Sequence, residues 1–147
     1  MTQVLISQFF ERDLGKLKEE ISVYNPETKL WIIKNEIKNS AGNLCWHITG
    51  GLLYFIGSVL GNTEYIRDRD AEFSDKNIPM KDLINRVDDT MKIIKNVLES
   101  LDEVKMKEKF PISPFNKEVS TEYFLLHLYG HLNYHLGQIN YHRRLIN

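Results

Sequence analysis

Histidines are the residues of this chain whose spacing points most directly to chemistry. Four of the five lie near the carboxyl end, at steps of 4, 4 and 7 residues: His127, His131, His135 and His142. On a helix with about 100° per residue, these steps keep all four within about 80° of one another. Phe124, Tyr134 and Leu145 fall close by, so we expect the stripe to face a bundle interior, where buried histidines need partners.

Imidazole nitrogens arranged in this way can bind a divalent metal ion. Each step of four residues rises about 6 Å along a helix, whereas a metal–imidazole bond is only about 2.0–2.1 Å long. One ion can therefore take two neighbours of the row but not three. The pair is either His131 with His135 or His127 with His131, and helix geometry does not separate them. His127 could instead support a ligand without touching the ion.

A third ligand has to come from another helix, and His47 is the one histidine outside the row. Its face of the expected helix carries the smaller and more polar residues of an otherwise apolar segment. Three neutral imidazoles leave positions open to water or substrate, as in catalytic zinc sites rather than closed structural ones. Nickel, iron and manganese are alternatives to zinc, because ligand type discriminates poorly among them. The competing interpretation is a set of hydrogen-bonded core histidines.

Four segments with helical periodicity must position these side chains. We expect helices over residues 2–24, 40–60 and 80–104, and a last helix near the carboxyl end. Ser40 and Ser120 are the expected caps at the starts of the second and the last helix. Residues 27–39 are expected to form a loop with room for one turn. No strand pattern or glycine-rich phosphate loop is present. The fold class that follows is all-α, with one domain over residues 1–147.

Charged residues and glycines carry weaker signals. Arg67, Asp68, Arg69 and Glu72 could bind an acidic substrate at the rim of a site, but we favour a solvated charged loop. Glycines in two of the expected helices predict that a ligand or another helix approaches the helix backbone closely at these positions. They are Gly50, Gly51 and Gly57 in the second helix, and Gly130 and Gly137 in the last.

Composition excludes several partners and compartments. Lysine plus arginine number 19 against 20 acidic residues, so no basic surface for nucleic acid is expected. The single Cys45 allows no internal disulfide, which favours the reducing cytoplasm. On a helix, Cys45 points about 160° away from His47 and cannot bind the same ion, so we expect a buried structural thiol. Residues 44–60 are apolar but shorter than the roughly 20 residues of a membrane span, so we expect a buried helix and no membrane partner. The amino terminus has no signal-like pattern.

Two motifs resemble those of a known superfamily. HLNYHLGQI at residues 131–139 resembles the last-helix H-x-x-x-H-x-G-Q-I motif of the DinB/YfiT-like superfamily, and His47 within GNLCWHITG at 42–50 resembles its second-helix histidine. The stretch GNTEYIRDRDAEF at 61–73 is similar to an uncharacterised branch. The resemblance implies a four-helix bundle with a crossover connection, a metal site of His47, His131 and His135, and frequent homodimers.

The resemblance also suggests a reaction. Characterised members of the superfamily include enzymes that use low-molecular-weight thiols, although many members have no known activity. We therefore expect a divalent-metal-binding protein, with zinc or nickel, that acts as a thiol-dependent S-transferase on a small electrophile. The alternatives are a metal-dependent hydrolase and a non-catalytic metal- or ligand-binding stress-response module. No general base can be named from the sequence.

Overall fold

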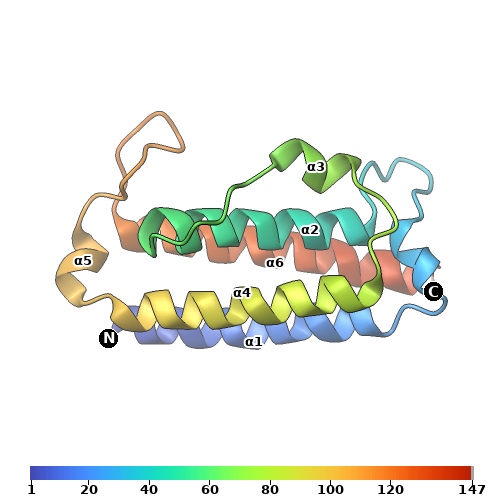
Figure 1. The fold of residues 1–147 in the computed structure, drawn as a ribbon, viewed down its shortest axis with the longest axis horizontal. Coiled ribbons are helices and arrows are strands. Elements are labelled where there is room, and N and C mark those ends of the chain that lie inside the picture. The colour runs from blue at the N-terminus through green and yellow to red at the C-terminus, as the bar shows by residue number, and fades with distance from the viewer. Residues whose placement is uncertain (147) are drawn as a thin grey trace.

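Four long helices lie side by side in the computed structural model, which describes residues 1–146 (Figure 1). The long helices are α1 (Thr2–Ser22), α2 (Ala41–Leu52) with its π-helical continuation η2 (Leu53–Leu60), α4 (Met80–Ser100) and α6 (Thr121–Ile146). Three short elements connect them: η1 (Glu27–Trp31), α3 (Arg69–Ser74) and α5 (Glu103–Lys107). The described residues form no named strand, and this confirms the all-α class.

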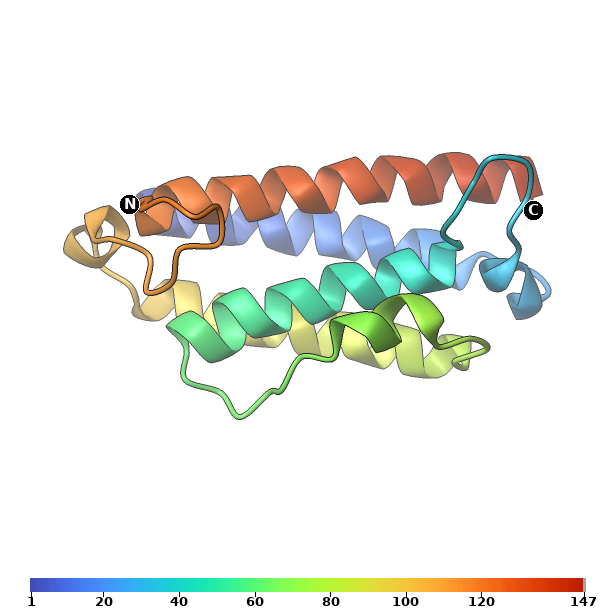
Figure 2. The same cartoon turned by 90° about the horizontal axis from the view of Figure 1, so that it is seen from above.

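The order of the helices requires one long crossover. α1 and α6 run in one direction, while α2 and α4 both run in the other (Figures 1 and 2). Because α2 and α4 are parallel, the chain between them returns along the length of the bundle and carries α3 across the outside of α2. α1 packs against α4 and α6, and α2 packs against α6 and α4. The predicted four-helix bundle with a crossover connection is confirmed.

Apolar stripes at helical spacing form the core. In α1, Phe10, Leu14, Leu17 and Ile21 are fully buried, and α4 contributes a matching row at residues 83–98. Burial of each such side chain stabilises the fold by about 1.5–3 kcal/mol relative to leaving it in water. Apolar side chains of α2 and α6, such as Ile48 and Leu132, join the same core.

The apolar α2–η2 segment is a core helix. Residues Ala41–Leu60 are long and apolar enough to cross a membrane, but 67% of an 18-residue apolar window within them is buried inside the bundle, as in the core helix of a soluble protein. Ser40 starts α2 as predicted, because its hydroxyl accepts a hydrogen bond from the backbone N–H of Asn43. Cys45 is buried, as expected, and burial raises the pKa of its thiol to about 12.

Three expectations about the helices need correction. The helix predicted over residues 80–104 ends at Ser100, because Leu101 is extended and the Asp102 carboxylate caps the separate helix α5. The segment predicted as a charged loop holds α3, which the Asp68 side chain caps at the N–H of Ala71. The first helix, predicted to reach residue 24, ends at Ser22. At the starts of α3 and α5, an aspartate side chain caps a new short helix that the hydrophobic periodicity does not predict.

Candidate metal centre

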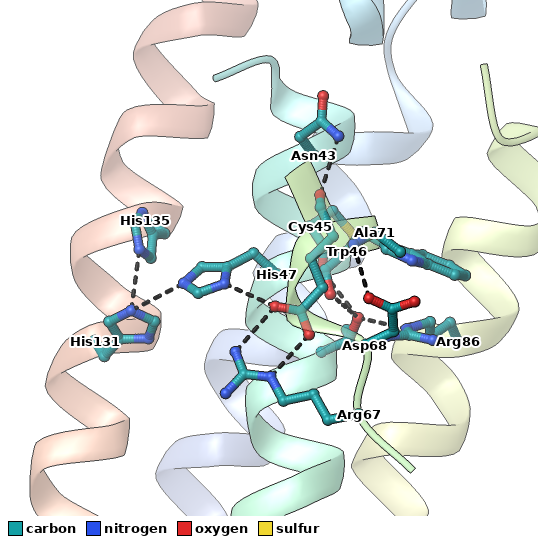
Figure 3. A network of polar contacts seen from close by, with 12 residues as sticks. Asn43, Cys45, Trp46, His47, Arg67, Asp68, Ala71, Arg86, His131 and His135 are labelled. Atoms are coloured by element: carbon teal, nitrogen blue, oxygen red, sulfur yellow. Dashed lines mark hydrogen bonds and ion pairs between the residues drawn. The ribbon is translucent and has the colours of Figure 1, made fainter. Parts of the chain in front are cut away.

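Three imidazoles from two helices converge on one point. His47 extends from α2 toward His131 and His135 on α6 (Figure 3). The Nε2 atom of His131 lies 3.3 Å from Nε2 of His47 and 3.1 Å from Nε2 of His135. One ligand atom from each of the three residues lies within 4.8 Å of the other two. The structure therefore brings together the three side chains that the sequence singled out.

The donor set fits a single divalent ion. Nitrogen ligands at about 2.0–2.1 Å from a tetrahedral ion lie about 3.3 Å from one another. The two Nε2–Nε2 distances, 3.3 and 3.1 Å, are close to that value. Nitrogen lone pairs at this separation repel unless a proton or a cation lies between them. One proton can bridge only one of the two pairs, whereas one ion can satisfy all three nitrogens.

Hydrogen bonds on the far side of two rings orient the inward nitrogens. Nδ1 of His47 lies 2.9 Å from Oε1 of Glu72, and Nδ1 of His135 lies 2.7 Å from Oε1 of Gln138. Each oxygen accepts from Nδ1–H, which leaves the lone pair on Nε2 and directs it toward His131. Partners of this kind fix the tautomer of metal-binding histidines and raise their basicity.

Glu72 is a buried carboxylate with a full set of partners. It is 1% exposed, and Arg67 donates to both of its oxygens, from Nε at 2.8 Å and from Nη2 at 2.9 Å. Burial alone would raise the pKa of Glu72, but the hydrogen bonds from His47 and Arg67 outweigh it and lower this pKa. The carboxylate is therefore ionised at neutral pH, and its charge strengthens the hold on His47.

The role of Glu72 differs from the one predicted from the sequence, which placed Glu72 in a solvated charged loop with Arg67, Asp68 and Arg69. The interpretation as a solvated loop is wrong for the Glu72 side chain, because α3 packs against α2 and places this carboxylate against His47. Asn43 reinforces the contact, since its Nδ2 donates to the backbone carbonyls of Glu72 and Asp75. A usable signal was present: metal-binding histidines commonly donate to a carboxylate, and the crossover follows the helix of His47 directly.

Burial keeps the imidazoles of His131 and His135 neutral. Burial, together with charge repulsion from the neighbouring His135 and His47, lowers the pKa of His131 to about 4. The pKa of His135 is also lowered, chiefly by burial. At pH 7 both rings are neutral, so an incoming metal ion would not have to displace the second proton of an imidazolium.

The other two α6 histidines have different surroundings. His127 is exposed and packs against aromatic rings, with its centroid 4.7 Å from that of Phe115 and 5.7 Å from that of Phe124. His142 is buried, with Nδ1 2.7 Å from the Tyr24 hydroxyl and Nε2 2.8 Å from the Ile32 carbonyl oxygen. His142 thus joins α6 to the chain after α1, a structural contact.

The stripe of α6 histidines does not face the interior as a whole. Leucines one third of a turn away occupy the centre of the buried face, at residues 125, 128, 132 and 136. The histidine row therefore lies at the edge of that face, and Tyr134 and Leu145 beside it are exposed. The expectation that the whole stripe is buried is wrong because the larger apolar row competes for the same core.

A cavity of about 240 Å³ opens beside the three histidines. His47 and His131 form part of its wall, so the nitrogen cluster is accessible from it. Aromatic and basic side chains from several elements complete the lining, among them Phe55, Phe115, Phe124, Arg67, Arg69 and His127. A small molecule in this cavity would lie next to an ion held by the histidines.

The comparisons with known proteins give a family and a fold. A family described as "Protein of unknown function (DUF1572)" matches residues 5–147. The crystal structure of a conserved protein from Enterococcus faecalis covers 97% of this chain and 95% of its own, with a TM-score of 0.78 and 18% identity. At that identity the likeness shows a shared fold alone. No curated protein matches the chain.

Two adjacent glycines of α2 test the role of the Glu72 carboxylate. A Cβ atom at Gly50 would overlap Oε2 of Glu72, well inside the 3.0 Å that real Cβ atoms keep, whereas one at Gly51 would lie 3.5 Å from Arg67 Nη2. We expect Gly50→Ala to lower the free energy of unfolding by about 1–3 kcal/mol, despite a helix-propensity gain of about 1 kcal/mol. Zinc affinity should fall about 10- to 100-fold, because Glu72 no longer orients His47.

Gly51→Ala is the matched control, because it receives the same propensity gain without the overlap. Denaturant unfolding and competition with a zinc chelator measure the two effects. Unchanged zinc affinity in Gly50→Ala, or equal behaviour of the two variants, would show that Glu72 does not support the histidine cluster.

Proposed function

We propose that this chain, which belongs to the DUF1572 family, is a divalent-metal-binding S-transferase of the DinB/YfiT-like superfamily that joins a low-molecular-weight thiol to a small electrophile. The observation that carries the proposal is the convergence of three Nε2 atoms, two of them oriented by partners at Nδ1. His47, His131 and His135 are the proposed ligands. In the overall reaction, the thiol sulfur bonds to the electrophilic carbon, the leaving group departs with its electron pair, and the thiol proton passes to solvent.

Zinc or nickel is the metal that we propose. When bound, the ion would supply a Lewis acid that lowers the pKa of a thiol or a water molecule next to the three nitrogens. The chain itself keeps His131 and His135 neutral and orients His47 and His135 through their Nδ1 partners, and the adjacent cavity admits a small substrate. The single Cys45 is buried and has no partner for a disulfide, so we place the protein in the reducing cytoplasm.

A homodimer is the oligomeric state that we propose, and the outer face of α6 supports it. Large apolar and aromatic side chains that are 52–69% exposed follow this face from end to end: Tyr123, Leu126, Tyr134, Tyr141 and Leu145. Gly130 and Gly137 lie among them with open space at the position of a Cβ atom. These glycines have no close neighbour among the described residues, so we assign the close approach predicted for them to a second copy.

The oligomeric proposal predicts that a Tyr123→Asp/Tyr141→Asp variant sediments as a monomer where the parent protein sediments as a dimer. Both tyrosines are more than half exposed, so the fold itself should tolerate the change. Ile66→Asp, at a position 89% exposed on the crossover, is the control and should leave the dimer intact. Sedimentation velocity distinguishes the states, and a monomeric parent protein would contradict the proposal.

Cobalt substitution tests the reaction class. Low-molecular-weight thiols such as cysteine, glutathione and bacillithiol should each be added to the cobalt-loaded protein. We expect at least one to change the visible spectrum and to be consumed with a small electrophile such as 1-chloro-2,4-dinitrobenzene. A His131→Ala/His135→Ala variant should show neither effect, because it lacks two of the three ligands.

Other outcomes of this experiment favour the alternatives. Hydrolysis of 4-nitrophenyl acetate without thiol, at a rate that depends on the metal, would identify a metal-dependent hydrolase instead. A metal-loaded protein that is inert to thiols and esters would contradict both enzymes and favour a non-catalytic binding or stress-response module.

A further inference from the structure

The cavity beside the histidines combines positive charge with an apolar wall. Arg67 and Arg69 both line it, and no aspartate or glutamate is among the described residues of its lining. Phe55, Phe115 and Phe124 form much of the remaining wall. A cavity of this composition has chemical features for a particular class of ligand, apart from the metal that the histidines would hold.

The sequence around the two arginines alternates in charge, as Arg67-Asp68-Arg69-Asp70. The arginines line the cavity, whereas Asp68 and Asp70 do not. Asp68 lies away from His131 and His135 (Figure 3). Its carboxylate accepts a hydrogen bond from the backbone N–H of Ala71. Asp68 precedes α3 as its N-cap, whereas Arg69 and Asp70 lie in its first turn, where successive side chains point about 100° apart. The local geometry thus separates the cations from the acids.

The two arginines differ in what neutralises them. Arg67 forms a two-point ion pair with the buried Glu72, so its charge is balanced inside the protein. Arg69 has no carboxylate partner among the described ion pairs, and its guanidinium lies 5.3 Å from the centroid of the Phe73 ring. The cavity therefore has one uncompensated positive charge at its exposed rim, contributed by Arg69.

Aromatic rings provide the complementary apolar surface. Phe115 is 37% exposed and contacts both Phe124 and His127, so part of its ring is free to face a ligand. Flat apolar molecules pack favourably against such rings. A volume of about 240 Å³ suits a ligand the size of a substituted benzene rather than a peptide or a nucleotide.

We propose that this cavity binds a small carboxylic acid with an aromatic or similarly apolar body, and that the electrophilic substrate belongs to this class. The carboxylate pairs with Arg69 at the rim, and the body lies against Phe115 with its far end toward the histidines. The assignment of this ligand as substrate rests on the proposed function, whereas the binding itself does not require the metal.

Phenylacetate and phenylacetamide form a matched pair of probes, because they share a body and differ in charge. Isothermal titration calorimetry on the full chain, metal-free and zinc-loaded, measures both. We expect phenylacetate to bind about two- to fivefold more tightly in each form, as one partly exposed ion pair would give. Arg69→Gln should remove this preference, and Arg144→Gln at the far end of α6 should retain it.

The apolar wall has its own variant. Phe115→Ala should weaken both probes by a similar factor, because it removes contact area without changing charge. Equal affinity of the two probes for the parent protein would overturn the proposal. An Arg69→Gln variant that keeps the preference for phenylacetate would overturn it as well.

The same measurements separate this inference from the proposed function. If the protein binds no metal, yet Arg69 confers a preference for phenylacetate, the proposed function fails and the anion site stands. If thiol transfer is observed but the protein binds phenylacetate and phenylacetamide with equal affinity, the site assigned to Arg69 fails and the proposed function stands.

Discussion

Burying a carboxylate costs several kcal/mol unless opposite charge and hydrogen bonds replace its water, and Glu72 shows how this bundle meets that cost. Arg67 supplies the charge, His47 supplies a hydrogen bond, and Gly50 leaves the volume that the carboxylate occupies. The Glu72 carboxylate fixes the crossover to α2 together with Asn43, which donates to the backbone carbonyls of Glu72 and Asp75. The orientation of His47, and hence of the nitrogen cluster, depends on this carboxylate.

Helix geometry accounts for the remaining two members of the cluster. A step of four residues on α6 brings His131 and His135 together, and the contact of α2 with α6 sets both opposite His47. The same crossover that provides Glu72 also provides the arginines of the adjacent cavity. The crossover between α2 and α4 therefore supplies the Glu72 carboxylate that orients His47, and it also supplies the positive charge of Arg67 and Arg69 in the adjacent cavity.

Periodic features could be predicted from the sequence, and contacts made by irregular segments could not. Ser40 and Ser120 were recognisable as caps, and the spacing of the α6 histidines limited one ion to two of them. The preference for His131 with His135 over His127 came from resemblance to a superfamily, since periodicity within one helix cannot separate the pairs. The role of Glu72 was not predicted, because a short capped helix inside a charged stretch has no periodic signal. Nothing in the pattern of charges indicates that α3 buries this one carboxylate.

Elemental analysis of the purified, untagged protein tests the central claim most directly. The parent protein should contain close to one equivalent of a divalent transition metal, as should the His127→Ala variant, because His127 lies outside the nitrogen cluster. A His131→Ala/His135→Ala variant should contain little. Absence of metal in the parent protein after reconstitution with zinc and with nickel, or equal loading of the double variant, would contradict a three-histidine metal centre.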